Sequence, residues 1–183
     1  QHQSVREDIA RSVCEIEQAR LLTLMAADRM DRYGNKVAKD LIAGIRQGSR
    51  RAIGRAITAV ESGGTTGREV LSAIYPHTGG AIRLGLTGPP GVGKSTLISA
   101  LVANRRAAGQ QVAVVSVDPS SPFTHGAVLG DRIRLVDHFT DPGVFIRSMA
   151  SRGQLGGVSE GTAGAMAVLD AAGFDVVIVE TVG

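Results

Sequence analysis

A glycine-rich loop between a strand and a helix most constrains the fold of this chain. The segment Gly88–Thr96 reads Gly-Pro-Pro-Gly-Val-Gly-Lys-Ser-Thr and fits the pattern G-x-x-x-x-G-K-[ST]. Residues 81–87 before it predict a short buried strand, and the apolar residues 97–103 after it predict a helix. This order brings backbone N–H groups and the positive end of a helix around one anion. A glycine-rich turn without a ligand would not need both flanking elements, so the segment predicts a phosphate site.

The loop pattern also assigns roles to its side chains. Lys94 is expected to reach the β- and γ-phosphates, and the Ser95 hydroxyl is expected to ligate Mg²⁺. The candidate nucleotide-binding residues are Gly88, Pro89, Pro90, Gly91, Val92, Gly93, Lys94, Ser95 and Thr96.

Two carboxylates follow apolar runs that predict buried strands. Asp118 comes after the strand at 111–117, and Glu180 ends the strand at 174–180. The carboxyl ends of parallel strands carry the ligands of such sheets, so both residues are candidate Mg²⁺ ligands and, with Lys94, candidate catalytic residues. Asp118 could instead start a turn, and Glu180 could be a solvated strand end.

Four further residues are weaker candidates. Asp131 lies in a glycine-containing segment that could move when phosphate and metal bind. His125 is more typical of a surface loop than of catalysis. Arg152 could meet phosphate or a partner, or stay solvated. The backbone N–H of Gly183, after Glu180, could meet the γ-phosphate.

The remaining pattern predicts an α/β fold with a mostly parallel sheet, preceded by helices. Helices are expected at 36–47, 50–61 and 160–172, and a possible further strand at 144–149. Two capping boxes are expected, Ser4 with Glu7 and Thr66 with Glu69, and Gly34 is a plausible helix stop. Aromatic residues make up only 3% of the chain, so aliphatic residues must build the core.

Charge and cysteine content limit the possible partners and compartment. The net charge of +3 comes from residues 1–80, without the aromatic residues that a nucleic-acid platform needs. No apolar run reaches the length of a membrane span, and no signal peptide is seen, which favours the cytoplasm. The single cysteine, Cys14, cannot form an intrachain disulfide and is expected to be buried.

Several motifs together resemble the MeaB/ArgK family of G proteins. They are GPPGVGKST, SVDPSSP, GDRIR, FIRSMASRG and ETVG, and the resemblance covers residues 41–183. The family acts as a GTPase chaperone of adenosylcobalamin-dependent methylmalonyl-CoA mutase. The resemblance therefore implies GTP, Mg²⁺, homodimerisation, and protection and cofactor loading of the mutase. It also implies a metal and switch region at Asp118, Asp131 and Glu180. His125 stands where the family usually has Gly.

Two features depart from that family. Its guanine-selecting N-K-x-D motif and later strands are absent before Gly183, which favours a truncated G domain. Residues 1–40 instead resemble the C-terminal helical domain of acyl-CoA dehydrogenases, without its catalytic or flavin-contacting parts. The expected domains are thus this segment, a helical extension at 41–80, and a P-loop domain at 81–183.

Two rival functions stay open at the level of sequence. A P-loop kinase or ATPase would share the loop, but no acceptor site is apparent. A truncated fusion could instead act only as a binding module through its N-terminal helices. A turnover assay separates the second rival from a GTPase, and phosphate transfer to an acceptor separates the first.

Overall fold

The computed structural model describes residues 12–25, 36–118, 138, 140–150 and 159–181. The chain divides into two compact units, Gln1–Lys36 and Val37–Gly183. In the first unit, residues 12–25 form a helix on which Cys14 is exposed, so the prediction of a buried cysteine is wrong. The expected capping box at Ser4 and the stop at Gly34 lie outside the described residues.

The second unit is built on a parallel sheet of four strands, in the order β1-β4-β2-β3. The strands are β1 Ile82–Leu86, β2 Val112–Asp118, β3 Val144–Ala150 and β4 Val176–Thr181. The helices are α2 Lys36–Arg46, α3 Arg50–Glu61, α4 Thr65–Ile74, α5 Lys94–Ala107 and α6 Glu160–Ala171, with a short 3₁₀ turn at Tyr75–His77. The predicted α/β class is confirmed.

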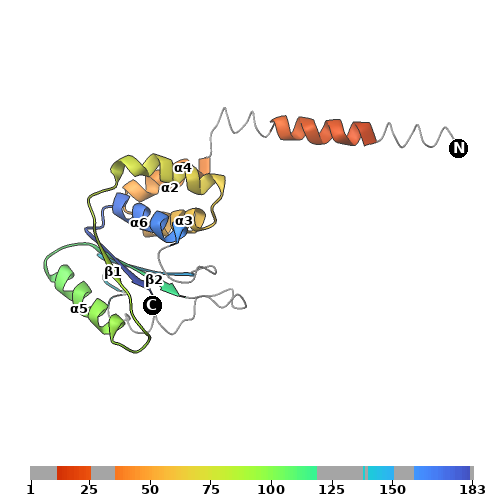
Figure 1. Cartoon of the computed structure of the whole chain (residues 1–183). Coiled ribbons are helices and arrows are strands. Elements are labelled where there is room, and N and C mark those ends of the chain that lie inside the picture. The colour runs from red at the N-terminus through yellow and green to blue at the C-terminus, as the bar shows by residue number, and fades with distance from the viewer. Residues whose placement is uncertain (1–11, 26–35, 119–137, 139, 151–158, 182–183) are drawn as a thin grey trace, which may run out of the picture. The chain divides into compact units, whose positions relative to one another are not determined.

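Helices cover both faces of the sheet. Figure 1 shows α5 on one face and α2, α3, α4 and α6 on the other. Parallel strands need crossover connections, and here α5 joins β1 to β2 while α6 joins β3 to β4. Because both faces are covered, the two central strands, β2 and β4, read as mainly apolar runs rich in valine, whereas the outer strands β1 and β3 contain arginine.

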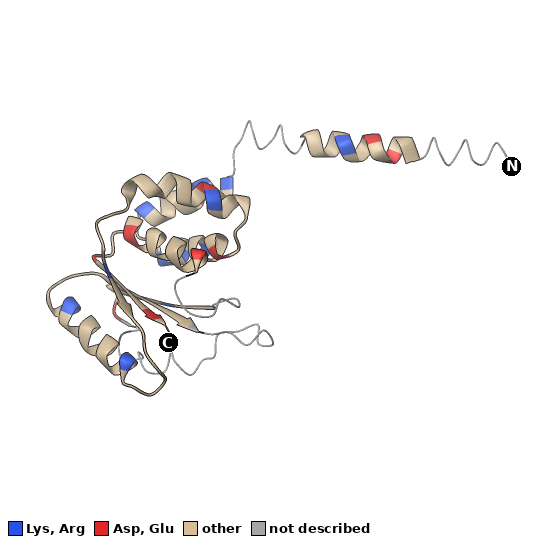
Figure 2. Cartoon of the chain, viewed as in Figure 1, with Lys and Arg blue, Asp and Glu red and all other residues tan. Residues whose placement is uncertain are grey.

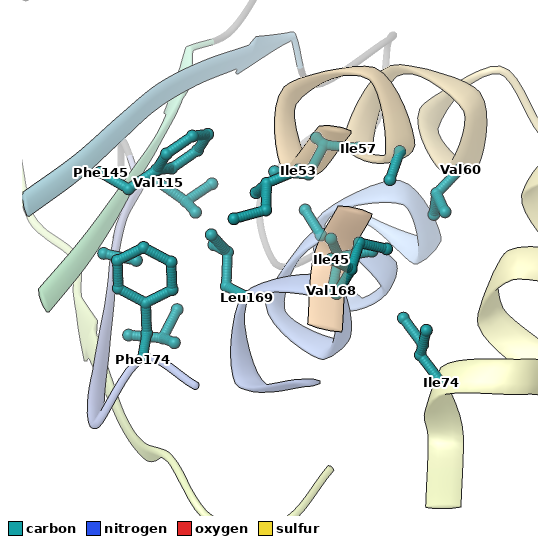
Figure 3. Close-up of a cluster of buried hydrophobic side chains, with 14 of the residues drawn as sticks. Ile45, Ile53, Ile57, Val60, Ile74, Val115, Phe145, Val168, Leu169 and Phe174 are labelled. Carbon is teal, nitrogen blue, oxygen red and sulfur yellow. The ribbon is translucent and has the colours of Figure 1, made fainter. Parts of the chain in front are cut away.

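Two apolar clusters fill the space between these layers. The larger lies between the sheet and the helical layer, where Ile53, Ile57 and Leu169 pack towards Val115 (Figure 3). The Phe145 and Phe174 rings lie in this cluster with their centroids 5.9 Å apart. The smaller cluster lies beneath α5 and contains Ile98, Val102, Val112, Val114, Val144, Val176 and Ile178. The helices before β1 therefore share one core with the sheet.

Serine side chains cap two helices, but one expected cap does not form. Ser49 accepts a hydrogen bond from the Ala52 N–H at the start of α3, and Ser159 caps α6 in the same way. The predicted capping box at Thr66 and Glu69 is wrong, because α4 already begins at Thr65. Its N-cap is Gly64, which has no side chain to accept the bond.

A buried carboxylate fixes the start of β1 against α6. The Asp170 side chain is 1% exposed and accepts hydrogen bonds from the backbone N–H groups of Gly79, Gly80 and Ala81. It also pairs with the Arg83 guanidinium at 2.9 Å. Burial raises the pKa of Asp170, but these donors outweigh it and leave the pKa below its usual value. The anchor therefore sets where the strand that leads into the glycine loop begins.

Candidate nucleotide-binding site

The glycine loop connects β1 to α5 in a conformation that requires glycine. Gly91 and Gly93 have φ angles of 80° and 93°, in the left-handed region that other residues rarely adopt. No atom lies within 4 Å of where a Cβ would stand at either position, so the backbone angle and not space selects glycine. The predicted strand, loop and helix are all present, although α5 begins at Lys94 rather than at residue 97.

Lys94 folds back over the loop that precedes it. Its Nζ donates hydrogen bonds to the carbonyl oxygens of Gly88 at 2.6 Å and Pro89 at 2.9 Å. The ammonium group is thus held within the loop, where the sequence pattern predicts a phosphate. A negatively charged oxygen is a stronger partner for an ammonium group than a neutral carbonyl.

Ser95, on the first turn of α5, meets Glu180 at the end of β4. The Ser95 side chain is buried, and its hydroxyl donates to Glu180 Oε1 at 3.4 Å. The hydroxyl of Ser116 on β2 approaches the other oxygen, Oε2, at 3.5 Å. Both distances are long for hydroxyl–carboxylate hydrogen bonds, so each contact is weak. The structure therefore brings together two predicted residues and a third, Ser116, which opens the SVDPSSP motif but was not among the predicted site residues.

The strand register places the backbone of Asp118, the second predicted metal ligand, at the same end of the sheet as Glu180. Glu180 is the direct partner of Leu86 on β1 and of Ser116 on β2. Asp118 is the last residue of β2, two positions after Ser116. The predicted switch and loop residues lie outside the described part of the chain: His125, Asp131, Arg152 and Gly183.

The donor atoms at this edge fit a hard divalent cation. The Ser95 hydroxyl and the Glu180 carboxylate offer oxygen ligands, which Mg²⁺ prefers. Among the described residues, no group of three or more His, Cys, Asp or Glu side chains could form an all-protein metal cage. Mg²⁺ is commonly held by one or two protein ligands together with phosphate oxygens and water, so the residues present fit this cation.

These features define a P-loop nucleotide-binding domain. A strand, a glycine loop and a helix follow one another, Lys94 contacts the loop, and Glu180 contacts Ser95 at the start of the helix. The family model described as "Methylmalonyl Co-A mutase-associated GTPase MeaB" matches residues 53–183. The chain belongs to this family.

Similar proteins come from archaea, bacteria and animals. The chain is 56% identical over 144 residues to a protein of Pyrococcus abyssi whose name carries the word GTPase, covering 79% of this chain. It is 46% identical over 143 residues to the GTPase ArgK of Escherichia coli, covering 76% of this chain. It is 38% identical over 169 residues to the mitochondrial methylmalonic aciduria type A homolog of Caenorhabditis briggsae, covering 82% of this chain.

The fold also resembles a solved structure, and the matches share one limit. The crystal structure of a LAO/AO transport system kinase superposes with a TM-score of 0.61 at 35% identity, over 81% of this chain and 44% of that one. The chain spans only 44%, 43% and 40% of the three relatives named above. The resemblance of residues 1–40 to acyl-CoA dehydrogenases has no support among these matches and stays a prediction.

Charged side chains elsewhere are spread over several elements. Lys and Arg lie among Asp and Glu on α2, α3 and α4, whereas α5 carries only Lys and Arg (Figure 2). Near the start of β3, Arg106 pairs with Asp141 at 2.9 Å, and this hydrogen bond lowers the pKa of Asp141.

None of the described helices combines the length and apolar character that crossing a membrane requires.

Proposed function

We propose that this chain carries the nucleotide-binding site of a Mg²⁺-dependent protein that hydrolyses GTP. The observation that carries the proposal is the arrangement of Lys94, Ser95 and Glu180 at one edge of the sheet. The amine lies over the glycine loop, and a hydroxyl lies 3.4 Å from a carboxylate oxygen. The choice of GTP is supported by membership of a GTPase family, because the loop itself reads phosphates and not the base.

Each residue then has a distinct role. The backbone N–H groups of Gly91–Thr96 hold phosphate oxygens, because the two prolines just before them have no N–H to donate. Lys94 exchanges its carbonyl partners for the β- and γ-phosphates. Ser95, Glu180 and Asp118 hold Mg²⁺, either directly or through water. When bound, Mg²⁺ neutralises charge on the phosphate oxygens during transfer to water. Catalysis by these residues is therefore mainly positioning and charge stabilisation.

The proposed partner of the whole protein is adenosylcobalamin-dependent methylmalonyl-CoA mutase. The family description names this mutase, and the name of the Caenorhabditis briggsae relative refers to methylmalonic aciduria. Protection and cofactor loading of the mutase, a homodimeric state and a cytoplasmic location belong to the same proposal. Sedimentation of the chain with purified mutase tests the partner. A complex that depends on a GTP analogue supports it, and the absence of any complex counts against it.

A second candidate is a P-loop kinase, favoured by the name of the similar solved structure. The two reactions differ in the group that accepts the γ-phosphate. GTP and ATP labelled on the γ-phosphate, each incubated with the purified chain, Mg²⁺ and a mixture of small-molecule candidate acceptors, separate them. Release of the label as inorganic phosphate, with GTP preferred, supports the GTPase. Label retained on an organic acceptor supports the kinase, and no turnover with either nucleotide favours a binding module.

A further inference from the structure

We propose that Ser116 is a positioning residue that holds the Glu180 carboxylate in the orientation needed for the metal site. The inference rests on the proposed function, because it assigns to Ser116 a role in Mg²⁺ binding by Glu180. Ser116 is the first residue of the SVDPSSP motif, but within that motif only Asp118 was predicted to belong to the site.

The location of Ser116 in the sheet is unusual for a polar residue. It lies in β2 on the face towards α5, because residues two apart share a face and Val112 and Val114 belong to the cluster under that helix. The residue as a whole is only 7% exposed. Burying a hydroxyl without a hydrogen-bond partner is unfavourable, because the group loses its hydration. A valine here would avoid that cost, so the hydroxyl needs a reason to be present.

Its partner across the sheet supplies that reason. Ser116 and Glu180 are direct partners in the parallel register of β2 and β4. The partner of Glu180 on the other side, in β1, is the apolar Leu86. Ser116 is therefore the polar neighbour of the carboxylate within the sheet, and its hydroxyl lies 3.5 Å from Oε2.

The two hydroxyl groups approach different oxygens of the Glu180 carboxylate. Ser95 approaches Oε1 at 3.4 Å, and Ser116 approaches Oε2 at 3.5 Å. The last torsion of a glutamate side chain is broad, so a carboxylate held at one oxygen can rotate over a wide range. A second contact on the opposite oxygen narrows this range. Ser116 thus directs Oε1 towards Ser95, which is the proposed ligand on the loop.

The test compares nucleotide affinity with and without Mg²⁺, using a fluorescent, non-hydrolysable GTP analogue. Ser116→Ala is expected to lower affinity about three- to tenfold in Mg²⁺ and to leave affinity in EDTA within about twofold. Ser116→Thr keeps the hydroxyl and is expected to recover most of the loss. The matched control is Ser148→Ala, because Ser148 is the register partner of Ser116 on β3 and is one strand further from Glu180. Bound Mn²⁺, measured by electron paramagnetic resonance in the presence of the analogue, should fall for Ser116→Ala in the same proportion.

A double-mutant cycle keeps the proposal falsifiable if Ser116→Thr does not fold. In a Glu180→Ala background, Ser116→Ala should cause no further loss, because the carboxylate that it positions is gone. Full additivity of the two changes would overturn the proposal. Two results for Ser116→Ala would also overturn it: an equal loss of nucleotide affinity in Mg²⁺ and in EDTA, or a gain in affinity on adding Mg²⁺ that equals that of the wild type. If the wild-type chain binds no nucleotide, the proposed function itself has failed. That result differs from one in which the chain binds nucleotide but Ser116→Ala leaves the effect of Mg²⁺ on affinity unchanged.

Discussion

The Ser95 hydroxyl lies 3.4 Å from Oε1 of Glu180, although the two residues are 85 positions apart in the chain. The first turn of α5 and the end of β4 meet there because β4 is the direct neighbour of β1 in the sheet. A loop that is local in sequence is thereby combined with a carboxylate from a distant strand.

Removal of the Glu180 carboxylate should separate metal binding from phosphate binding. Glu180→Ala is expected to reduce the gain in nucleotide affinity that Mg²⁺ provides by about tenfold, roughly 1.4 kcal/mol. Affinity in EDTA should change little, because Lys94 and the loop remain. Titration calorimetry with and without Mg²⁺ measures both. Glu69→Ala removes a carboxylate from α4, where the expected cap does not form, and serves as the control. An equal Mg²⁺ response in Glu180→Ala and wild type would remove Glu180 from the metal site.

The Asp170 anchor predicts a large effect on stability. Asp170→Asn removes the charge that pairs with Arg83 and places an amide N–H₂ group where backbone N–H groups of the chain already point. We expect the free energy of unfolding to fall by about 2–4 kcal/mol, because buried donors lose their acceptor. Urea unfolding of the two proteins at neutral pH measures this difference. A change below about 0.5 kcal/mol would mean that the anchor contributes little.

The same anchor predicts how stability depends on pH. The pKa of Asp170 is lowered in the folded protein, so its contribution is complete above the unfolded pKa of about 3.9. The contribution is lost as the pH falls through the folded pKa. The difference in unfolding free energy between wild type and Asp170→Asn should be constant from about pH 5 to 7 and should shrink below about pH 4. A difference that grows on acidification would contradict the assigned direction.

Close helix packing predicts opposite effects for two glycines. A Cβ at Gly67 of α4 would overlap the backbone carbonyl of Ala59 in α3, whereas a Cβ at Gly54 would meet nothing within 4 Å. Gly67→Ala is expected to destabilise the protein by about 1–3 kcal/mol, because backbone must shift. Gly54→Ala should stabilise it by roughly 0.5–1 kcal/mol through helix propensity. Thermal unfolding of both variants checks this contrast, and similar shifts in the same direction would refute it.

The division of the chain predicts that its first unit contributes nothing to nucleotide or flavin chemistry. Deletion of residues 1–35, which leaves α2 intact, should change nucleotide affinity by less than about threefold, roughly 0.7 kcal/mol. The purified full chain should show no flavin absorbance. Loss of nucleotide binding from a deleted chain that keeps its circular dichroism, or a bound flavin, would show that the division is wrong.

Local patterns explain most of what the sequence predicted correctly. The α3 helix matches its expected bounds of 50–61, because apolar periodicity is a local signal. The β4 strand begins at Val176, two residues after its expected start at residue 174. The predicted start of α4 is wrong. Thr66 and Glu69 fit a capping-box pattern, but the helix begins one residue earlier, at Thr65, with Gly64 as its N-cap. The α5 helix is longer than expected at both ends, because its polar first residues Lys94–Thr96 and its polar last turn carry no apolar signal.

The parts that could not be predicted depend on pairing between distant segments. The sequence does not indicate that Ser116 lies beside Glu180, because that contact depends on the pairing of β2 with β4. Asp170 likewise reads as an ordinary polar residue of an alanine-rich helix, yet its partners are 87 to 91 positions away. Ser116 shares a face of β2 with Val112 and Val114, and this position becomes informative only once the strand order is known.

The most direct test of the account is the affinity of Lys94→Ala for a non-hydrolysable GTP analogue with Mg²⁺, measured by titration calorimetry. Lys36→Ala, an exposed lysine at the start of α2, is the matched control. We predict a loss of at least about 100-fold for Lys94→Ala, roughly 2.7 kcal/mol, with unchanged circular dichroism and wild-type affinity for the control. Equal affinity of Lys94→Ala and wild type would contradict the assignment of the glycine loop as the phosphate site.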